Sequence, residues 1–285
     1  MLAGFYSGVS GIYYNEQKLG VVSNNIANAE TTGFHSNYLM FRTRKEQPGT
    51  AWIDPAAKKR LPDIYGMQRE AVFQNTASGS IQQTGNPLDL TLAPELQNAF
   101  FSVKRTDLKD SETYYTRNGT LSVGKLDETN PSSPNILHIA GSIGTDSNGQ
   151  PIVINPQAGA LSVGADGIVR QGTATIGQLG IYRLNKSADP AEITPANLQS
   201  LVRMGDSLYQ IPPLLTNEFH PQIIEIGKNN VNRIVIQGAR ESSNVNIMNE
   251  LVETMNITKD AAANQASIAM QADSLTKLFQ LVRSG

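Results

Sequence analysis

Apolar residues near the N-terminus recur every seven positions, a spacing typical of coiled-coil-like helices. The positions of this line and its flank are Leu2, Phe5, Val9, Ile12, Leu19 and Ile26. The pattern predicts a helix from Leu2 to about Ala27. Several glycines interrupt it, and each weakens an isolated helix by about 1 kcal/mol relative to alanine. We therefore expect this helix to need a packing partner, either the core of its own domain or another helix.

A second apolar line lies near the C-terminus, with spacings of three, four or seven residues. Its members are Met248, Leu251, Met255, Thr258, Ala262, Ala269, Ala272 and Phe279. The alanines in its middle would let another helix approach closely. Ser243 and Asn244 are both suited to cap a helix N-terminus. The pattern thus predicts a helix that begins at Asn244 and Val245 and continues to about residue 282.

Between the two helical patterns, short runs of β-branched and aromatic residues alternate with turn residues. Residues 114–117 precede Asn118-Gly119 and residues 120–123, which is a strong hairpin signal. The other predicted strands are residues 88–92, 100–103, 136–139, 152–154, 160–163, 168–170, 179–184, 208–211, 223–226 and 234–236. Many short strands of this kind are typical of an all-β barrel or sandwich.

These patterns predict an α+β protein in three parts. Residues 1–42 and 241–285 would form a discontinuous, coiled-coil-like helical domain, and residues 81–240 a central all-β barrel or sandwich. Residues 43–80 are polar and broken by proline and glycine, so we expect an extended or loosely strand-like linker there.

The charge balance and the residue content exclude several classes of partner and site. The 285 residues include 23 Lys and Arg against 25 Asp and Glu, a formal net charge of −2. Such a balance provides no field that would attract nucleic acid, so we expect no nucleic-acid partner. The chain has no cysteine, which excludes disulfides and thiolate metal sites.

The sequence shows neither a membrane-spanning segment nor a cleavable leader. No apolar run reaches the roughly 18 residues that a transmembrane helix needs. The N-terminus lacks both a basic region and an unbroken apolar region, so it does not resemble a signal peptide. We expect a protein that is cytoplasmic or is exported by a route that needs no such leader.

Candidate catalytic groups are poor. The three histidines, His35, His138 and His220, lie in unrelated contexts and form no metal-ligand motif. Asp146-Ser147-Asn148-Gly149 lacks the spacing of a calcium loop and is better interpreted as a turn. We therefore predict no catalytic, metal or cofactor site and no small-molecule substrate. A hydrolase would need a pocket that brings a histidine within hydrogen-bond reach of a serine or carboxylate.

A dense group of amide side chains closes the first helical pattern. Asparagine side chains compete with a continuing helix, while glycine allows positive φ, so the local prediction is a helix end followed by a shaped turn. The residues that make up this motif are Asn24, Asn25, Ile26, Ala27, Asn28, Thr31, Gly33 and Phe34. The motif resembles the signature near the N-terminus of bacterial flagellar rod and hook proteins.

The resemblance continues along the chain in the order of that family. Residues 79–90, 100–103, 115–119 and 238–245 are similar to its segments leading into, through and out of the β region. Ala99 replaces a usual glycine and Arg240 a usual leucine. Near the C-terminus, a family pattern is reduced to residues 258–264, of which Asn264 is the clear match.

The resemblance implies a structural subunit of the flagellar rod, the tubular axial drive shaft of the basal body. Its terminal helices would contact other copies and other flagellar axial proteins, and would order on assembly. It also implies export through the flagellar type III apparatus to a periplasmic position. The modest length argues against a hook subunit. Residues 34–88 lack a long glycine-containing insertion, which favours a proximal-rod type.

Two alternatives remain open from the residues. A coiled-coil-stalked β protein, such as an adhesin or a phage-tail component, would share the layout but form a closed ring or trimer. A hydrolase built on the β region is the enzyme alternative.

Overall fold

A computed structural model describes most of the chain, in two compact units. The residues outside the description are 1, 47–63, 76, 97, 106–111, 128–129, 131, 186–200, 206, 212–219, 225–232 and 285, with the side chains of 2–6, 42–46, 64–71, 185, 281–282 and 284. The helical unit comprises Met1–Ala27, Asn37–Phe73 and Asn246–Gly285. The β unit comprises Asn28–Ser36 and Gln74–Val245.

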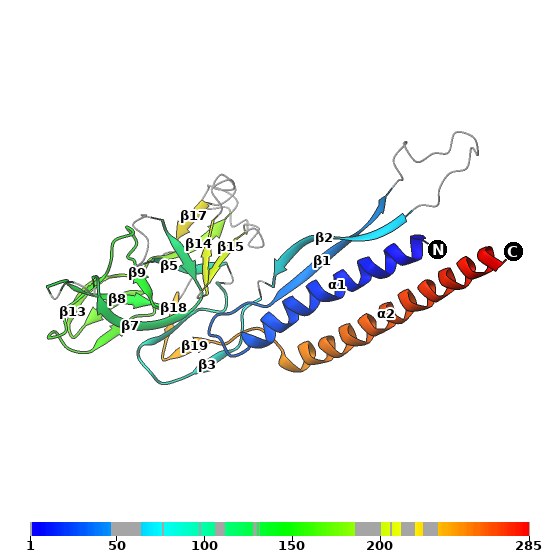
Figure 1. Ribbon diagram of the computed structural model, residues 1–285. Coiled ribbons are helices and arrows are strands. Elements are labelled where there is room, and N and C mark those ends of the chain that lie inside the picture. The colour runs from blue at the N-terminus through cyan, green and yellow to red at the C-terminus, as the bar shows by residue number, and fades with distance from the viewer. Residues whose placement is uncertain are drawn as a thin grey trace. The chain divides into compact units, whose positions relative to one another are not determined.

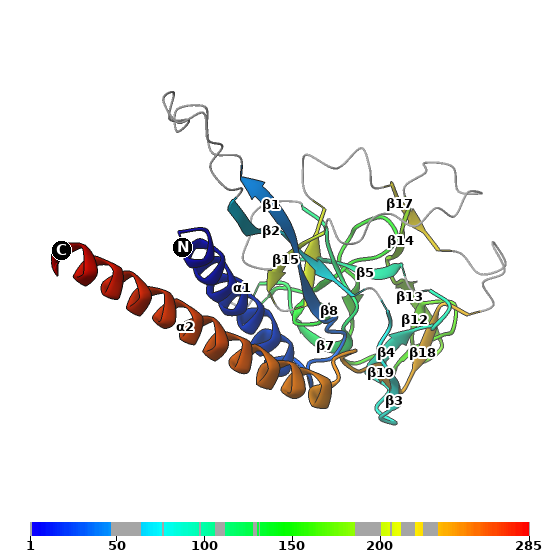
Figure 2. The ribbon, with the colours of Figure 1, turned by 90° about the vertical axis from the view of Figure 1, so that its right-hand side faces the viewer.

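The helical unit is built on two antiparallel helices, α1 (Leu2–Ala27) and α2 (Ile247–Ser284), which lie side by side with both chain ends at the same end of the pair (Figure 1). Strands β1 (Asn37–Glu46) and β2 (Ile64–Gln74) pair with each other. Helix α1 lies between α2 and β1 (Figure 2). The predicted helix over Leu2–Ala27 is confirmed. Among the described residues, no helix combines the length and apolar character needed to span a membrane.

The α1 face that contacts α2 differs from the predicted apolar line. The buried positions of α1 are Gly8, Asn15, Val22 and Asn25, whereas Val9 is exposed and Ile12, Leu19 and Ile26 are only half-buried. A Cβ at Gly8 would lie 2.8 Å from Cγ1 of Ile268, and one at Gly11 would lie 2.7 Å from Nδ2 of Asn264. Glycine therefore brings the helices together, and the apolar line is left partly to solvent. The side chains of Leu2 and Phe5 lie outside the description.

Helix α2 begins later than the sequence predicts. Its cap is Asn246, whose Oδ1 accepts the N–H of Asn249 at 3.2 Å. The prediction of a cap at Ser243 or Asn244 is wrong, and Asn244 and Val245 precede the helix. The reason is tertiary, because the side chain of Asn244 is used elsewhere in the β unit.

The β unit is dominated by one large sheet. Its strand order is β15-β16-β6-β5-β9-β8-β7-β4-β18, with β10 on β8, β14 on β5 and β17 on β14. Their bounds are β4 (Asp89–Leu92), β5 (Ala99–Lys104), β6 (Tyr114–Thr116), β7 (Gly119–Lys125), β8 (Asn135–Ile139), β9 (Ser142–Gly144), β10 (Val153–Ile154), β14 (Ile181–Asn185), β15 (Val202–Gly205), β16 (Leu208–Gln210), β17 (His220–Ile223) and β18 (Val235–Gln237). The described strands make no closed ring, so the barrel is not confirmed, whereas the α+β class is.

Two small sheets complete the β unit. They are β11-β12-β13, formed by β11 (Leu161–Val163), β12 (Ile168–Gln171) and β13 (Ala174–Gln178), and the pair of β3 (Ile81–Gln83) with β19 (Ala239–Glu241). The main core lies among the large sheet and β11 to β13, with fully buried Leu90, Phe101, Ile139 and Val169. Most predicted strands are confirmed. Of the predicted strand at 223–226, Ile223 ends β17, and residues 225–226 lie outside the described residues.

The Asn118-Gly119 hairpin prediction is wrong. Strands β6 and β7 flank this dipeptide, yet β6 pairs with β5 and β16, and β7 pairs with β4 and β8. Gly119 is required for another reason, because a Cβ there would lie 2.1 Å from the carbonyl oxygen of Leu90. The glycine serves a close approach of strands rather than a turn.

Part of the predicted linker is strand, in line with the strand-like alternative. Residues 43–80 include the end of β1 and all of β2, which belong to the helical unit up to Phe73. Its centre, residues 47–63, lies outside the description.

Candidate functional site

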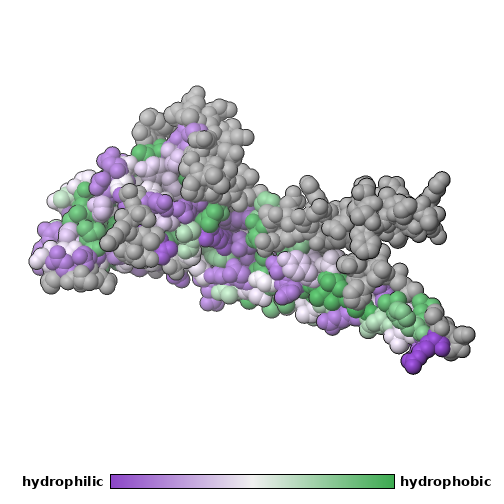
Figure 3. Space-filling view, turned by 45° about the horizontal axis from the view of Figure 1, so that its top comes forward, coloured by the Kyte–Doolittle hydropathy of each residue, from purple (hydrophilic) through white to green (hydrophobic). Residues whose placement is uncertain are grey.

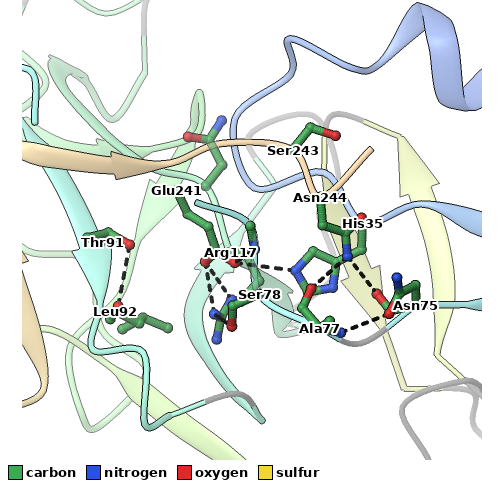
Figure 4. Close-up of polar contacts among 12 residues, drawn as sticks. His35, Asn75, Ala77, Ser78, Thr91, Leu92, Arg117, Glu241, Ser243 and Asn244 are labelled. Carbon is green, nitrogen blue, oxygen red and sulfur yellow. Dashed lines mark hydrogen bonds and ion pairs between the residues drawn. The ribbon is translucent and has the colours of Figure 1, made fainter. Parts of the chain in front are cut away.

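Three segments that are far apart in the sequence meet in the β unit. They are the end of the amide-rich motif at residues 33–36, the loop after β6 at Arg117, and the segment from β19 to Asn244 (Figure 4). We call the cluster formed by Gly33, Phe34, His35, Arg117, Glu241 and Asn244 the junction. Each of its segments was singled out by resemblance, but the sequence did not predict that they touch.

A buried ion pair forms the centre of the junction. Nε of Arg117 donates to Oε2 of Glu241 at 3.0 Å, and Nη2 of Arg117 lies 2.8 Å from the same oxygen. Arg117 is 1% exposed and Glu241 2%. The guanidinium also donates from Nη1 to the carbonyls of Leu96 and Ala99, each at 2.8 Å. An arginine suits this place because its fixed fork of donors reaches several acceptors at once.

The carboxylate of Glu241 is held by further groups. Its Oε1 accepts the N–H of Gly79 at 3.0 Å and lies 3.6 Å from Nε2 of the buried His35. Burial alone would raise the pKa of Glu241, but the His35 imidazole, the Arg117 charge and the Gly79 N–H outweigh it, and the pKa lies below its usual range. A Cβ at residue 79 would lie 1.8 Å from the carbonyl oxygen of Ser242, which explains the glycine.

Gly33 and Phe34 dock the motif onto this pair. The N–H of Gly33 donates to the backbone oxygen of Glu241 at 2.9 Å. Gly33 has a φ of 67°, and a Cβ there would lie 2.8 Å from the carbonyl carbon of Arg117. Phe34 is buried beneath the guanidinium of Arg203, whose Cζ lies 4.5 Å from the ring centroid. Both the glycine and the aromatic ring are therefore required by tertiary contacts.

Asn244 ties the returning chain to two other segments. Its Oδ1 accepts the N–H of Ser36 at 2.7 Å, and its Nδ2 donates to the carbonyls of Asn75 and Ala77 at 3.1 and 2.6 Å. Its own N–H donates to the carbonyl of Phe34. One amide thus links the segments by which the chain enters and leaves the β unit.

A second amide of the motif plays a similar part in the helical unit. Asn25 is buried, and its side chain bonds both the N–H and the carbonyl of Asn37, each at 2.8 Å. It also donates to Oε1 of Glu250, in the first turn of α2, at 3.2 Å. Asn25 therefore joins the end of α1 to the starts of β1 and α2.

Comparison with known proteins gives the geometry a context. A family model described as flagella basal body rod protein matches residues 5–35, which run from α1 through the motif into the junction. The flagellar basal-body rod protein FlgF of Caulobacter vibrioides is 29% identical over 254 residues, 89% of this chain and 87% of that protein. The chain is therefore similar to flagellar basal-body rod proteins over most of its length. Its motif is hereafter the rod signature.

Two further relatives extend the similarity. The flagellar basal-body rod protein FlgG of Bacillus subtilis is 28% identical over 297 residues, 99% of this chain and all of that protein. The flagellar hook protein FlgE of Borreliella burgdorferi is 28% identical over 157 residues, 54% of this chain and 34% of the hook protein. The match to rod proteins thus runs through both units, whereas the match to the hook protein is partial.

The structure gives most residues of the rod signature a place. Ile26 and Ala27 end α1, and the N–H of Thr31 donates to the carbonyl of Asn28 at 3.1 Å in the following turn. The predicted helix end and shaped turn are confirmed. The roles of Arg117 and Glu241 were missed. The only signal for them was that each lies in a segment similar to the rod and hook proteins.

The predicted assembly residues of α2 fall on two faces. Met248, Leu251, Met255, Ala272 and Phe279 are all exposed. Asn264 instead lies against Gly11 of the same chain. Asn244 and Val245 belong to the β unit. The large apolar side chains of this line are therefore exposed in the isolated chain. Figure 3 shows patches of hydrophobic residues on the surface of the helical unit.

The hydrolase alternative needs a histidine within reach of a serine or carboxylate, and His35 is one candidate. His35 meets a carboxylate, but both side chains are almost completely buried within the junction. Asp146 forms the predicted turn, since its Oδ1 accepts the N–H groups of Asn148 and Gln150. In the part of the chain that the structure describes, no group of three His, Asp or Glu side chains could hold a metal.

Proposed function

We propose that this chain is a structural subunit of the bacterial flagellar rod, which assembles through its terminal helices with further copies and with other flagellar axial proteins. The observation that carries the assembly proposal is the exposed apolar line along α2. Relatives named as flagellar basal-body rod proteins support the place of assembly.

The apolar line on α2 is unusual because its large apolar side chains are exposed to water. Met255 is 58% and Phe279 73% exposed, while the only buried apolar side chain in the described part of α2 is that of Ile257. Apolar residues at heptad spacing bury themselves against another helix, at about 25 cal/mol for each Å² removed from water. Because the facing helix in the same chain covers a different side, the partner must come from another molecule.

An axial tube also fits the two-unit layout. Contacts between unlike patches of identical subunits generate open helical assemblies when the rotation between neighbours does not close into a ring. The α1 face toward α2 carries glycines and buried amides rather than a continuous apolar line, so the helical pair would gain stability when neighbours cover it. We propose that this marginal stability keeps subunits exportable through the flagellar type III apparatus, and that the helices gain their full stability only in the periplasmic rod.

The connector supports a proximal-rod type. Residues 34–88 carry β1, β2 and β3 and no long glycine-containing insertion.

The test is deletion of the gene in the source bacterium, with complementation and analysis of isolated basal bodies. Wild-type protein should co-purify with basal bodies and restore swimming. A Met248→Ser, Met255→Ser variant should be secreted or degraded without entering the rod, while Asp260→Ser, on another exposed face of α2, should swim normally. Swimming without the gene, or recovery of the protein in a cell-surface or phage-particle fraction, would refute the proposal.

A further inference from the structure

We propose that the outer face of α1 in one copy binds the exposed line of α2 in the next copy, antiparallel, so that large side chains of each helix meet small ones of the other. This inference rests on the proposed rod function and names the partner surface. It concerns faces that the contacts within one chain leave open.

The outer face of α1 is a second line, distinct from the face that touches α2. Its exposed members, spaced three or four residues apart, are Val9, Tyr13, Glu16, Gly20, Ser23 and Ala27. Tyr13 is 47% exposed, which is high for a tyrosine in a helix flanked by two other elements. The first half of this line is bulky and the second half, from Gly20 onward, is small.

The exposed line of α2 has the same asymmetry. Its first half carries Met248, Leu251 and Met255, and its second half carries Ala262, Ala269 and Ala272 before the line ends at Phe279. A parallel match of two α2 lines would set methionine against methionine and alanine against alanine, which leaves gaps that close packing disfavours.

The relative direction of α1 and α2 decides which half of one helix lies along which half of the other. Within one chain the two helices are antiparallel, since Gly8 faces Ile268 while Asn25 meets Glu250. In a polar tube all copies point the same way, so α1 of one copy is also antiparallel to α2 of its neighbour. The bulky half of α1 then lies along the alanine half of α2, and Gly20, Ser23 and Ala27 lie along the methionine half.

The contact inside the chain already follows this rule. Gly8 and Gly11 of α1 receive Ile268 and Asn264 of α2, whose nearest side-chain atoms lie 2.8 and 2.7 Å from the place of a Cβ on α1. Each helix would therefore use one face for its own partner helix and an adjoining face for a neighbour's. The interface would continue from chain to chain without closing, as a tube requires.

Because the chain has no cysteine, disulfide trapping can test this contact directly. One variant carries Tyr13→Cys and a second carries Ala262→Cys, and both are expressed together in the source bacterium. Basal bodies are isolated and analysed without reductant. The same is done with Gln265→Cys and Ala269→Cys as alternatives for the second variant, because the register along the line can shift by a turn.

At least one of these mixtures should give a dimer that contains one copy of each variant. Its yield should exceed that of the control mixture, Tyr13→Cys with Met248→Cys, by about tenfold, since a disulfide needs Cβ atoms about 4 Å apart. Ser23→Cys with Met255→Cys should also form the mixed dimer. Equal yields in the control, or dimers only between two α2 variants, would overturn the inference.

Two readouts separate the inference from the proposed function. Variant protein present in basal bodies without the mixed dimers refutes the contact and leaves the rod function intact. Wild-type protein absent from basal bodies refutes the rod function itself. If a cysteine variant fails to assemble, exchanging large and small side chains provides a second test. Ala262→Met should abolish swimming, and Tyr13→Ala in the same chain should restore it. If swimming is not restored, the proposed contact is refuted.

Discussion

The junction and the helical pair show opposite uses of polar and apolar side chains. At the junction, Arg117 and Glu241 are buried charges that bond each other and the segments at residues 78–79 and 96–99. In the helical pair, Met255 and Phe279 are apolar side chains left in water. The β unit therefore satisfies its buried charges within one chain, whereas the helical unit leaves apolar surface exposed that another helix would cover.

The rod signature spans both regions. Its first half ends α1 and uses Asn25 to hold the start of β1 and α2. Its second half enters the β unit, where Gly33 and Phe34 reach Glu241 and Arg203. The comparison predicts that changes at the junction act on the stability of the monomer, while changes on the outer helix faces act on assembly.

The largest effect should come from breaking the buried pair. Glu241→Ala leaves the guanidinium of Arg117 buried without its counter-charge, which costs about 3–5 kcal/mol of unfolding free energy. Urea unfolding followed by near-ultraviolet circular dichroism measures it. Arg240→Ala, on the exposed side of the same strand, is the control and should change little. Equal midpoints for the two variants would show that the pair does not hold the β unit.

A matched pair on α2 tests the contrast within the helical unit. Ile257→Ala removes a buried side chain and should destabilise the helical unit by about 2–4 kcal/mol. Met255→Ala removes an exposed one and should stay within about 0.5 kcal/mol. Far-ultraviolet circular dichroism in urea measures both in the monomer. Basal-body recovery should show a defect for Met255→Ala, and similar monomer stabilities for the two variants would refute the assignment of faces.

Gly33 and Gly85 have similar positive φ angles, so comparing them distinguishes the cost of backbone strain from the cost of a steric clash. Gly33 has a φ of 67° and Gly85 a φ of 70°, but only Gly33 has neighbours within 4 Å of its missing Cβ. Gly85→Ala should cost about 1–2 kcal/mol from its left-handed backbone alone. Gly33→Ala should cost more, because its Cβ must displace the backbone at Arg117. Equal losses in urea unfolding would mean that the docking of Gly33 is loose.

Acid should weaken the junction through Glu241. Its pKa is depressed in the folded state, so its contribution is complete above the unfolded value of about 4.3 and is lost as pH falls through the folded pKa. The unfolding free energy of wild type should decline in that range faster than that of Glu241→Gln. Other carboxyls, such as Asp166, are common to both proteins and cancel. Parallel pH profiles would exclude Glu241 as the acid-sensitive group.

The smallest predicted effect is an increase in the stability of α1. A Cβ at Gly20 meets nothing within 4 Å, so Gly20→Ala should stabilise α1 by up to about 1 kcal/mol. Gly11→Ala should gain less, because its Cβ would lie 2.7 Å from Nδ2 of Asn264. Helix content in the monomer measures both. A larger gain for Gly11 would show that the helices do not rely on its close approach.

The sequence predicted what depends on local patterns. The extent of α1, the turn after Asn28 and most strands follow from periodicity and from the backbone preferences of asparagine and glycine. The resemblance also identified the segments that contain the junction residues. It failed where a local signal had a tertiary cause: Asn118-Gly119 suggested a hairpin, but the glycine makes room for the carbonyl of Leu90.

The sequence by itself determined the two helices, the β-rich middle and the rod signature, because these depend on neighbours within a few residues. Only the tertiary structure decided which face of each helix is covered and which groups form the junction. Heptad spacing marks an apolar line but not its partner, and here the glycines of α1 took the inner contact. Likewise, Arg117 and Glu241 lie 124 positions apart, and only folding brings their charges together.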